Sequence, residues 1–291
     1  YTYNATRLDL DGPGQAWSLV AGTHTCGGAV LAGTGAFTFT PAGPIPPASC
    51  VVALQVCDTG APNLCATQST TVTITPVNDA PVPRSPAPSY TGNANLNFVM
   101  ADDGGDGAGG ILDLLDGATD PDGATTLTVV AGTFPTTSGG SVTVNANGSF
   151  SYQPAAGFVG NDSFTYQIQD SGIPLPAATT NVVATITVSD TDGAGAGTSV
   201  LWFIDEDATA SSNIGTQANP FRSLAAFNTA NTGAGNNPAD TDFIFLNDDS
   251  GADNNGDGAG VYGNGITLRA NQRLIGDGSS GTLGAIAGIS L

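Results

Sequence analysis

The stretch SVTVNANGSFSYQP, residues 141–154, decides the fold of this chain. Phe150 and Tyr152 alternate with serines, and apolar residues alternate in the same way in FTYQI, residues 164–168. A two-residue period places the large side chains on one face of a half-buried strand. Asn147-Gly148 separates the two halves of the first stretch, and this pair favours a two-residue hairpin turn because both positions adopt positive φ angles. The sequence therefore predicts antiparallel β-hairpins with one buried face.

The hairpin belongs to a unit that occurs twice in the chain. DLDG at residues 9–12 recurs as DPDG at 120–123, GAFTFTP at 35–41 recurs as GSFSYQP at 148–154, and VCDTGAP around Asp58 recurs as IQDSGIP around Asp170. The three offsets are 111, 113 and 112 residues. A unit of about 100 residues with many short strands has the size of an immunoglobulin-like sandwich. We expect a sandwich at 79–190, and before it a partial sandwich at 1–78 whose N-terminal strands are missing.

The charge of the chain is strongly negative, with 25 acidic residues against five basic ones and a formal net charge of -20. This balance excludes nucleic acid as a partner, because phosphate binding needs a basic surface. Glu206 is the single glutamate, and aspartate is the residue that suits turns and calcium loops. No stretch reaches the roughly 20 apolar residues that a membrane-spanning helix needs, so we expect no membrane span in this chain.

All four cysteines lie in the first quarter of the chain, at positions 26, 50, 57 and 65. Their spacing lacks the paired C-x₂₋₄-C pattern typical of zinc sites, which favours disulfides and an oxidising, extracellular location. Four cysteines allow three pairings. The preferred pairing is Cys57 with Cys65, across the loop CDTGAPNLC, and Cys26 with Cys50.

The Asp-x-Asp-Gly element, the Asp-x-Gly-x-Pro element and the linker PVNDAP at residues 76–81 resemble the signature of cadherin repeats. They are also similar to the bacterial cadherin-like and tandem immunoglobulin-like repeats of large adhesins, and the resemblance covers residues 1–190. In such repeats these residues bind Ca²⁺ and stiffen the rod. Pro76 and Ala80 depart from the family pattern, which has an acid and an asparagine there. The resemblance implies Ca²⁺ ligands at Asn78, Asp79, Asp120, Asp122 and Asp170, with a corresponding set at Asp9, Asp11 and Asp58; the alternative is that these residues only cap turns.

After a glycine-rich linker at 191–198 the repeat stops, and residues 199–291 resemble the entry to a pectate-lyase-like right-handed β-helix. A G-T-x-x-x-P-F-x-S-L motif leads into an expected capping helix at 220–228, and the first rungs are expected at 243–246, 266–268 and 273–275. The acidic loop between the first two of these rungs has the oxygen-rich spacing of a Ca²⁺ loop, with Asp253 and Asp257 as candidate ligands, but it lacks the terminal glutamate and flanking helices of an EF-hand, and the favoured alternative is a solvated acidic turn. The overall prediction is an all-β chain: tandem immunoglobulin- or cadherin-like sandwiches followed by the N-terminal turns of a parallel β-helix.

These expectations favour a non-enzymatic adhesin or stalk on a bacterial cell surface, with a glycan or another cell-surface ligand as partner. One alternative is a filament subunit that accepts a strand from a neighbouring copy of itself. The other is an accessory part of a β-helix polysaccharide lyase or hydrolase. The sequence shows no catalytic constellation of paired carboxylates or of histidine with a nucleophile.

Overall fold

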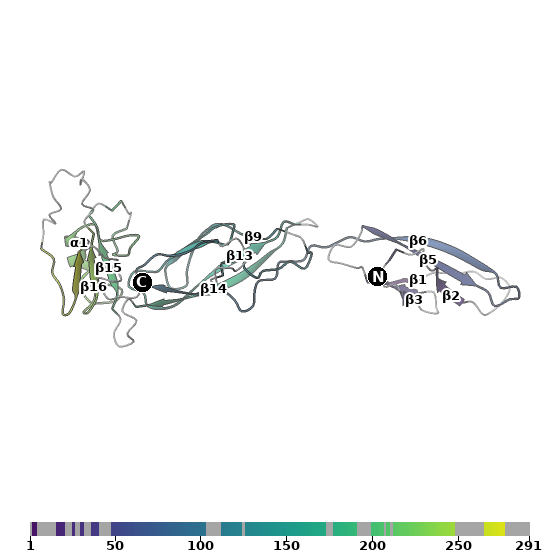
Figure 1. The fold of residues 1–291 in the computed structure, drawn as a ribbon, viewed down its shortest axis with the longest axis horizontal. Helices are drawn as coiled ribbons and strands as arrows, with labels where there is room; N and C mark the ends of the chain where they lie inside the picture. The colour runs from purple at the N-terminus through teal and green to yellow at the C-terminus, as the bar shows by residue number, and fades with distance from the viewer. Residues whose placement is uncertain are drawn as a thin grey trace. The chain divides into compact units, whose positions relative to one another are not determined.

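The computed structural model describes residues 2–4, 16–20, 25–26, 30–31, 36–40, 48–102, 112–123, 126–172, 177–190, 199–206, 208–209, 212–247 and 265–276 (Figure 1). The chain divides into two compact units. Unit 1 holds Tyr1–Ala80, Asp120–Thr126 and Asp170–Ala178, and unit 2 holds Pro81–Thr119, Leu127–Gln169 and Thr179–Leu291. The predicted linker 191–198 and the candidate ligands Asp9, Asp11, Asp253 and Asp257 lie outside the described residues.

Unit 1 contains two antiparallel sheets. One has the order β2 (Ala16–Leu19), β5 (Ser49–Cys57) and β6 (Cys65–Thr73), and the other has the order β1 (Thr2–Asn4), β4 (Ala36–Thr38) and β3 (Val30–Leu31). Apolar side chains from both sheets fill the core, which comprises Cys26, Phe37, Phe39, Cys50, Val52, Leu54 and Ile74. Cys50, Val52 and Leu54 of β5 face the core, as expected for every second residue of a strand, and Ala53 is buried as well.

Two disulfides tie unit 1 together, and they join the cysteines in the pairing that the sequence favoured. Cys26 and Cys50 are bonded in the buried core, with their Cα atoms 5.0 Å apart. Cys57 and Cys65 are bonded across the hairpin of β5 and β6, where the two residues are direct pairing partners. No cysteine is free. In the chain-entropy view each bond stabilises the fold by limiting the unfolded chain.

Unit 2 contains a sandwich of two four-stranded sheets. The first sheet has the order β10 (Gly132–Pro135), β11 (Ser141–Val144), β12 (Phe150–Gln153) and β8 (Phe98–Met100), and all its pairs are antiparallel. The second has the order β7 (Ser89–Asn93), β14 (Thr179–Ser189), β13 (Gly160–Gln169) and β9 (Thr128–Val129), with β7 parallel to β14. β11 and β12 form the predicted antiparallel hairpin, but not with the expected two-residue turn: Asn145 N donates to Ser149 O at 2.9 Å and Gly148 N donates to Asn145 O at 3.1 Å. Gly148 has a φ of 93°, whereas Asn147 does not have the expected positive φ.

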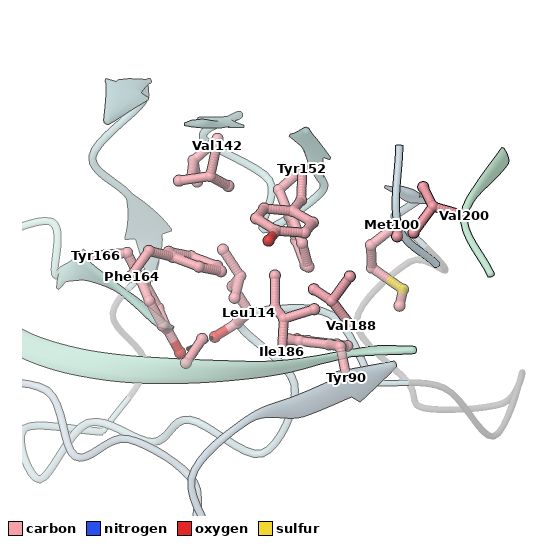
Figure 2. Close-up of a cluster of buried hydrophobic side chains, with 14 of the residues drawn as sticks. Tyr90, Met100, Leu114, Val142, Tyr152, Phe164, Tyr166, Ile186, Val188 and Val200 are labelled. Carbon is pink, nitrogen blue, oxygen red and sulfur yellow. Dashed lines mark hydrogen bonds between the residues drawn. The ribbon is translucent and has the colours of Figure 1, made fainter. Parts of the chain in front are cut away.

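The inner faces of these two sheets supply one hydrophobic core. Figure 2 shows Val142 and Tyr152 from the first sheet and Phe164, Tyr166, Ile186 and Val188 from the second pointing toward one another. Phe150 and Tyr90 have ring centroids 4.9 Å apart in an edge-to-face arrangement, a geometry favoured by the aromatic quadrupole. Phe150, Tyr152, Phe164 and Tyr166 in this core are residues that the alternating sequence places on one face.

The region after residue 198 adds a parallel sheet and one short helix. Strands β15 (Leu201–Ile204), β16 (Phe243–Leu246) and β17 (Arg273–Gly276) pair in parallel and in that order (Figure 1). Both faces of β15 are buried: Trp202 and Ile204 join the sandwich core, whereas Leu201 and Phe203 pack with Phe243 and Ile275. A strand that is buried on both faces is typical of a parallel sheet covered on both sides. Three parallel strands do not establish a β-helix, which stays a prediction.

The helix α1 (Leu224–Ala230) begins four residues later than the expected helix at 220–228. Phe221 causes the delay, because it lies alongside β15 with its amide donating to Phe203 O at 2.8 Å and its carbonyl accepting from Asp205 N at 2.8 Å. Ser223 then caps the helix, its hydroxyl accepting from Ala226 N at 3.1 Å. In the described part of the chain no helix has the length and apolar character needed to cross a bilayer.

The expected strand at 266–268 is absent, since this segment has no strand pairing. Its backbone instead bonds to side chains of the helix: Thr267 N donates to Asn228 Oδ1 at 2.8 Å, and Asn231 Nδ2 donates to Thr267 O at 2.8 Å. The segment therefore serves as a partner for α1 rather than as a rung. The strands expected at 243–246 and 273–275 correspond to β16 and β17.

Candidate metal-binding loops

The Asp170 carboxylate organises the loop that follows β13. Its Oδ1 accepts hydrogen bonds from Gly172 N at 2.7 Å and Ala178 N at 3.0 Å, and its Oδ2 accepts one from Asn78 Nδ2 at 2.9 Å. Burial raises the pKa of Asp170, but the three hydrogen bonds to the ionised form outweigh burial and hold the pKa below its usual value. Asp170 is therefore an anion at neutral pH that connects the linker residue Asn78 to this loop.

The loop that contains Asp120 and Asp122 holds the other linker residue. Asp122 is 2% exposed, and its Oδ2 accepts a hydrogen bond from Asp79 N at 2.7 Å. Asp120 Oδ1 accepts one from Asp122 N at 2.7 Å, which is the hydrogen bond of an Asx turn. Gly123 follows with a φ of 93°, a conformation that glycine adopts without strain. All five ligand candidates of this set lie within unit 1.

Two oxygen atoms in this set are buried and have no hydrogen-bond partner: Asn78 Oδ1 and Asp120 Oδ2. Buried polar atoms are normally paired, so two orphaned acceptors on the loops expected to bind Ca²⁺ fit a hard cation, which takes amide and carboxylate oxygens. The carboxylates themselves are less closely gathered. In the part of the chain described, no three Asp, Glu, His or Cys side chains form a group that could hold a metal ion. The oxygen ligands thus fit Ca²⁺ by their chemistry. The carboxylates, however, are not gathered closely enough in this structure to coordinate a single ion.

Asp58, the first-unit counterpart of Asp170, caps its own hairpin. Its Oδ1 accepts from Gly60 N at 3.0 Å and from Leu64 N at 3.0 Å, within the loop that the Cys57–Cys65 disulfide closes. Asp58 therefore caps its turn, as Asp170 does, and its part in a metal site stays a prediction. Asp9 and Asp11, the expected partners of Asp58, lie outside the described residues.

Asp162 in unit 2 is a structural carboxylate that the sequence did not single out. It is 2% exposed and accepts from Tyr152 OH at 2.9 Å, Thr137 Oγ1 at 2.9 Å and Ser138 N at 2.8 Å, among other donors. Burial raises its pKa, but the hydrogen bonds outweigh burial and lower the pKa overall. Both carboxylate oxygens of Asp162 accept hydrogen bonds, and these bonds hold the segment after β10 against β13.

Asp242 has a similar position under the parallel sheet. It accepts from Val200 N at 2.9 Å, Trp202 Nε1 at 2.8 Å and Ala239 N at 2.7 Å. Burial raises its pKa more strongly than these hydrogen bonds lower it. The Asp242 side chain bonds Val200 and Trp202 at β15 and Ala239 in the turn before β16, so its role is structural.

Asp113 and Asp116 form a buried acidic pair that the sequence did not indicate. The two residues lie at a turn before the Asp120 loop, and Asp113 is 0% and Asp116 is 3% exposed. Their spacing of three residues in LDLLDG is a common turn pattern, so it carries no signal without the burial that the fold imposes.

Comparisons with known proteins agree with the expected sandwich at residues 79–190. The sequence profile of the bacterial cadherin-like domain family matches residues 78–192, a range that begins at Asn78 and includes Asp79, Asp120, Asp122 and Asp170. This segment is therefore cadherin-like, and the described chain is all-β apart from α1. A search of curated proteins found no match.

Solved structures of low similarity include the EC1–4 region of Drosophila N-cadherin, at 13% identity and a TM-score of 0.37, covering 73% of this chain and 51% of that one. Mouse Cadherin-23 EC22–24 gives 15% identity and a TM-score of 0.35, covering 70% and 65%. An endo-fucoidan hydrolase from glycoside hydrolase family 107 gives 17% and 0.26, covering 61% and 24%. The chain spans about half the length of the N-cadherin structure, 51%. At these scores the similarity adds nothing on function.

Proposed function

We propose that this chain is a segment of an extracellular adhesion or stalk protein, without catalytic activity of its own. The cadherin-like segment at 78–192 carries the proposal, because cadherin-like domains typically serve adhesion rather than catalysis. Two disulfides in unit 1 fit an oxidising location outside the cytoplasm, such as a bacterial cell surface. The partner that fits such a segment is a glycan or another cell-surface ligand.

Ca²⁺ binding at the linker is the second part of the proposal. The ligands are Asn78, Asp79, Asp120, Asp122 and Asp170. Hydrogen bonds already join Asn78 to Asp170 and Asp79 to Asp122, and two orphaned oxygens, on Asn78 and Asp120, remain to be satisfied. A Ca²⁺ ion supplies the missing partner for such oxygens and fixes the linker against the two loops of unit 1. Loss of linker mobility would stiffen the stalk.

A calcium titration of the full chain tests this part. We expect the midpoint of thermal unfolding to rise with CaCl₂ and to fall with a chelator, because a ligand that binds only the folded state stabilises it. Asp120→Asn should abolish most of the linker-dependent shift, since it removes charge from an orphaned oxygen. Asp240→Asn is the matched control, because Asp240 is exposed and paired with Arg269 at 2.8 Å. An equal shift in wild type and the Asp120 variant would refute the linker site.

The three parallel strands are proposed to be the first rungs of a right-handed β-helix, with α1 covering their end. Supporting this, β15, β16 and β17 pair in register, and residues on both faces of β15 are buried. Such a region would present a ligand surface to a glycan or a second cell. Binding of the full chain to a panel of immobilised polysaccharides tests this role. Binding that persists after deletion of residues 199–291 would show that this region is not the ligand surface.

A second candidate function is a filament subunit, and the edge strand β6 is the observation that favours it. In the described part of unit 1, β6 pairs only with β5, over nine residues, and it carries neither lysine nor proline. Natural edge strands are usually guarded by such residues against pairing with another chain. The acceptor of a neighbour's strand would be the free side of β6.

Electron microscopy and sedimentation at rising protein concentration test the filament. If β6 accepts a strand, Ser69→Lys together with Thr71→Lys should abolish assembly while leaving the monomer folded. Val183→Lys is the control, because Val183 is 50% exposed on β14, a strand with neighbours on both sides. Isolated wild-type particles at every concentration would exclude the filament.

A further inference from the structure

Asp113 and Asp116 are a buried pair, and the carboxylate of each residue accepts a hydrogen bond from the backbone amide of the other. Asp113 Oδ1 accepts from Leu115 N at 2.7 Å and Asp116 N at 3.2 Å, and Asp116 Oδ2 accepts from Asp113 N at 2.7 Å. Leu114, between them in sequence, points into the sandwich core (Figure 2) and is 1% exposed. One oxygen of each carboxylate is therefore fixed by amides, and the turn is anchored by a core side chain.

The second oxygen of each carboxylate is buried and has no hydrogen-bond partner: Asp113 Oδ2 and Asp116 Oδ1. An unpartnered buried carboxylate oxygen costs free energy, because nothing replaces the water it has lost. Since each residue bonds the other's backbone, two such oxygens lie in one neighbourhood.

The groups around the pair do not supply that partner. Among the described residues, neither carboxylate forms an ion pair. Arg84 contacts Tyr90 OH at 3.4 Å, and Tyr90 OH donates to Leu112 O at 3.0 Å. Tyr166 OH donates to Leu114 O at 3.0 Å, and the Asp102 carboxylate accepts from Asn147 at 2.8 Å. The hydroxyl and amide donors are therefore engaged elsewhere, whereas Arg84 Nη1 is buried without a hydrogen-bond partner and bonds neither carboxylate.

Glycine at position 148 makes the site possible. A Cβ atom there would lie 2.7 Å from Asp113 Oδ1 and 3.1 Å from Asp113 Oδ2, so the hairpin backbone lies directly against the carboxylate. Gly148 O accepts from Leu114 N at 3.2 Å and so ties the hairpin to the turn. The close approach limits the room around the two oxygens to a small species.

Burial raises the pKa of Asp113, and the charges of Asp116 and Asp102 raise it further, although amide hydrogen bonds act in the opposite direction. Burial also raises the pKa of Tyr90 to about 12, despite the nearby Arg84 guanidinium. Asp113 therefore lies in a poorly solvated environment in which a positive species or a proton is favoured.

We propose that Asp113 and Asp116 bind a hard divalent cation inside the cadherin-like module, in unit 2 and separate from the linker ligands of unit 1. Two carboxylates carry two negative charges, which one divalent ion neutralises, and both free donors are oxygens of the kind that Ca²⁺ and Mg²⁺ prefer. With two carboxylates the site needs carbonyl or water oxygens to complete the shell. The ion would lock the turn at 113–116 onto the β11–β12 hairpin.

Calorimetric titration of the full chain with CaCl₂ alone and with MgCl₂ alone, at neutral pH, tests the proposal. The titrations use the Asp120→Asn, Asp170→Asn background, in which the linker site is removed, so failure of the linker proposal leaves this result readable. We expect one bound ion per chain in that background. Adding Asp113→Asn and Asp116→Asn should remove it, whereas adding Asp240→Asn should not.

Hydrogen exchange of the Leu115 and Asp116 amides gives a second measurement that needs no substitution at the pair. Both amides bond to Asp113 Oδ1, so ion binding should slow their exchange at least severalfold when CaCl₂ or MgCl₂ replaces chelator. No ion bound in the background, together with unchanged exchange, would overturn the proposal. A stability gain in the double variant without any ion dependence would also overturn it, and would indicate instead that the two carboxylates share a proton.

Discussion

Asp58 and Asp170, 112 residues apart in the sequence, close their hairpins in the same way. Each Oδ1 accepts from the amide two residues later, Gly60 N at 3.0 Å or Gly172 N at 2.7 Å. Each also accepts from the residue that returns toward the next strand, Leu64 N at 3.0 Å or Ala178 N at 3.0 Å. The repeat seen in the sequence is thus a repeat of hydrogen bonds. Only Asp170 takes the further bond from Asn78.

Asp170→Ala is therefore expected to destabilise the chain more than Asp58→Ala. Asp170 is 4% exposed and loses three hydrogen bonds to a charged group, a cost of about 2–4 kcal/mol. Asp58 is half-buried and loses two, at about 1 kcal/mol. Urea unfolding in the presence of chelator measures both without a contribution from bound ions. Equal losses would show that the bond to Asn78 contributes nothing.

The two disulfides should differ in their response to reductant. Cys26 and Cys50 are 1% and 3% exposed, whereas Cys65 lies exposed at the start of β6. Thiol exchange needs access of the attacking thiolate, so we expect Cys57–Cys65 to be reduced first in the folded protein. Mass spectrometry after timed alkylation, with and without urea, measures the order. Simultaneous reduction of both bonds without urea would contradict it.

Substitution of both cysteines of each pair tests their contribution to stability. The loops span 24 and 8 residues of sequence separation. Because the entropy of closing a loop grows with its length, removing Cys26–Cys50 should cost roughly 3.5 kcal/mol and removing Cys57–Cys65 roughly 2.5 kcal/mol. Replacing Cys26 and Cys50 by alanine limits the additional penalty for polar groups in the core. A larger loss for the exposed bond would contradict the loop-length argument.

Asp162 predicts a specific dependence of stability on pH. Its folded pKa lies below the ordinary value of 3.8, so its ionised form stabilises the fold at pH values above 3.8. This contribution is lost as the pH falls through the lowered folded value. Asp162→Asn should cost about 2–4 kcal/mol at pH 7, because an amide cannot accept all of these hydrogen bonds. The difference between variant and wild type should shrink at pH values below 3.8, as wild-type Asp162 becomes protonated.

Denaturant unfolding at a series of pH values from neutral to acidic measures this dependence. Asp240→Asn provides the reference for removing a charge at an exposed site. A constant difference between the Asp162 variant and wild type over the whole series would show that shape, rather than ionisation, accounts for the loss.

Local patterns in the sequence predicted the hairpin of β11 and β12 and the equivalence of Asp58 and Asp170, because turn chemistry and alternation act over a few residues. They could not predict where α1 begins, since that depends on Phe221 lying along β15, a strand about 20 residues earlier. The same reason explains the error at 266–268, whose backbone bonds to Asn228 of the helix and to its C-cap residue Asn231. The Asp113 and Asp116 pair was hidden because burial is a property of the folded sandwich.

Gly215, in the motif G-T-x-x-x-P-F, shows why that motif needs glycine. Gly215 has a φ of 81°, and a Cβ there would overlap Phe221 Cε2 and lie 2.7 Å from Trp202 Cε3. Phe221 and Trp202 are both buried, with rings stacked at 6.0 Å between centroids, so neither ring can move aside without opening the core. Gly215→Ala should therefore destabilise the chain by about 3 kcal/mol or more, combining backbone strain with overpacking.

Gly235→Ala is the matched control, because Gly235 also has a positive φ, 63°, but a Cβ there meets nothing within 4 Å. It should cost only the strain of the left-handed conformation, about 1 kcal/mol. The intrinsic tryptophan fluorescence, to which Trp17 also contributes, should shift in the Gly215 variant and stay unchanged in the Gly235 variant. Equal destabilisation by the two substitutions would mean that the positive φ angle alone, and not the close approach to Phe221, explains why position 215 requires glycine.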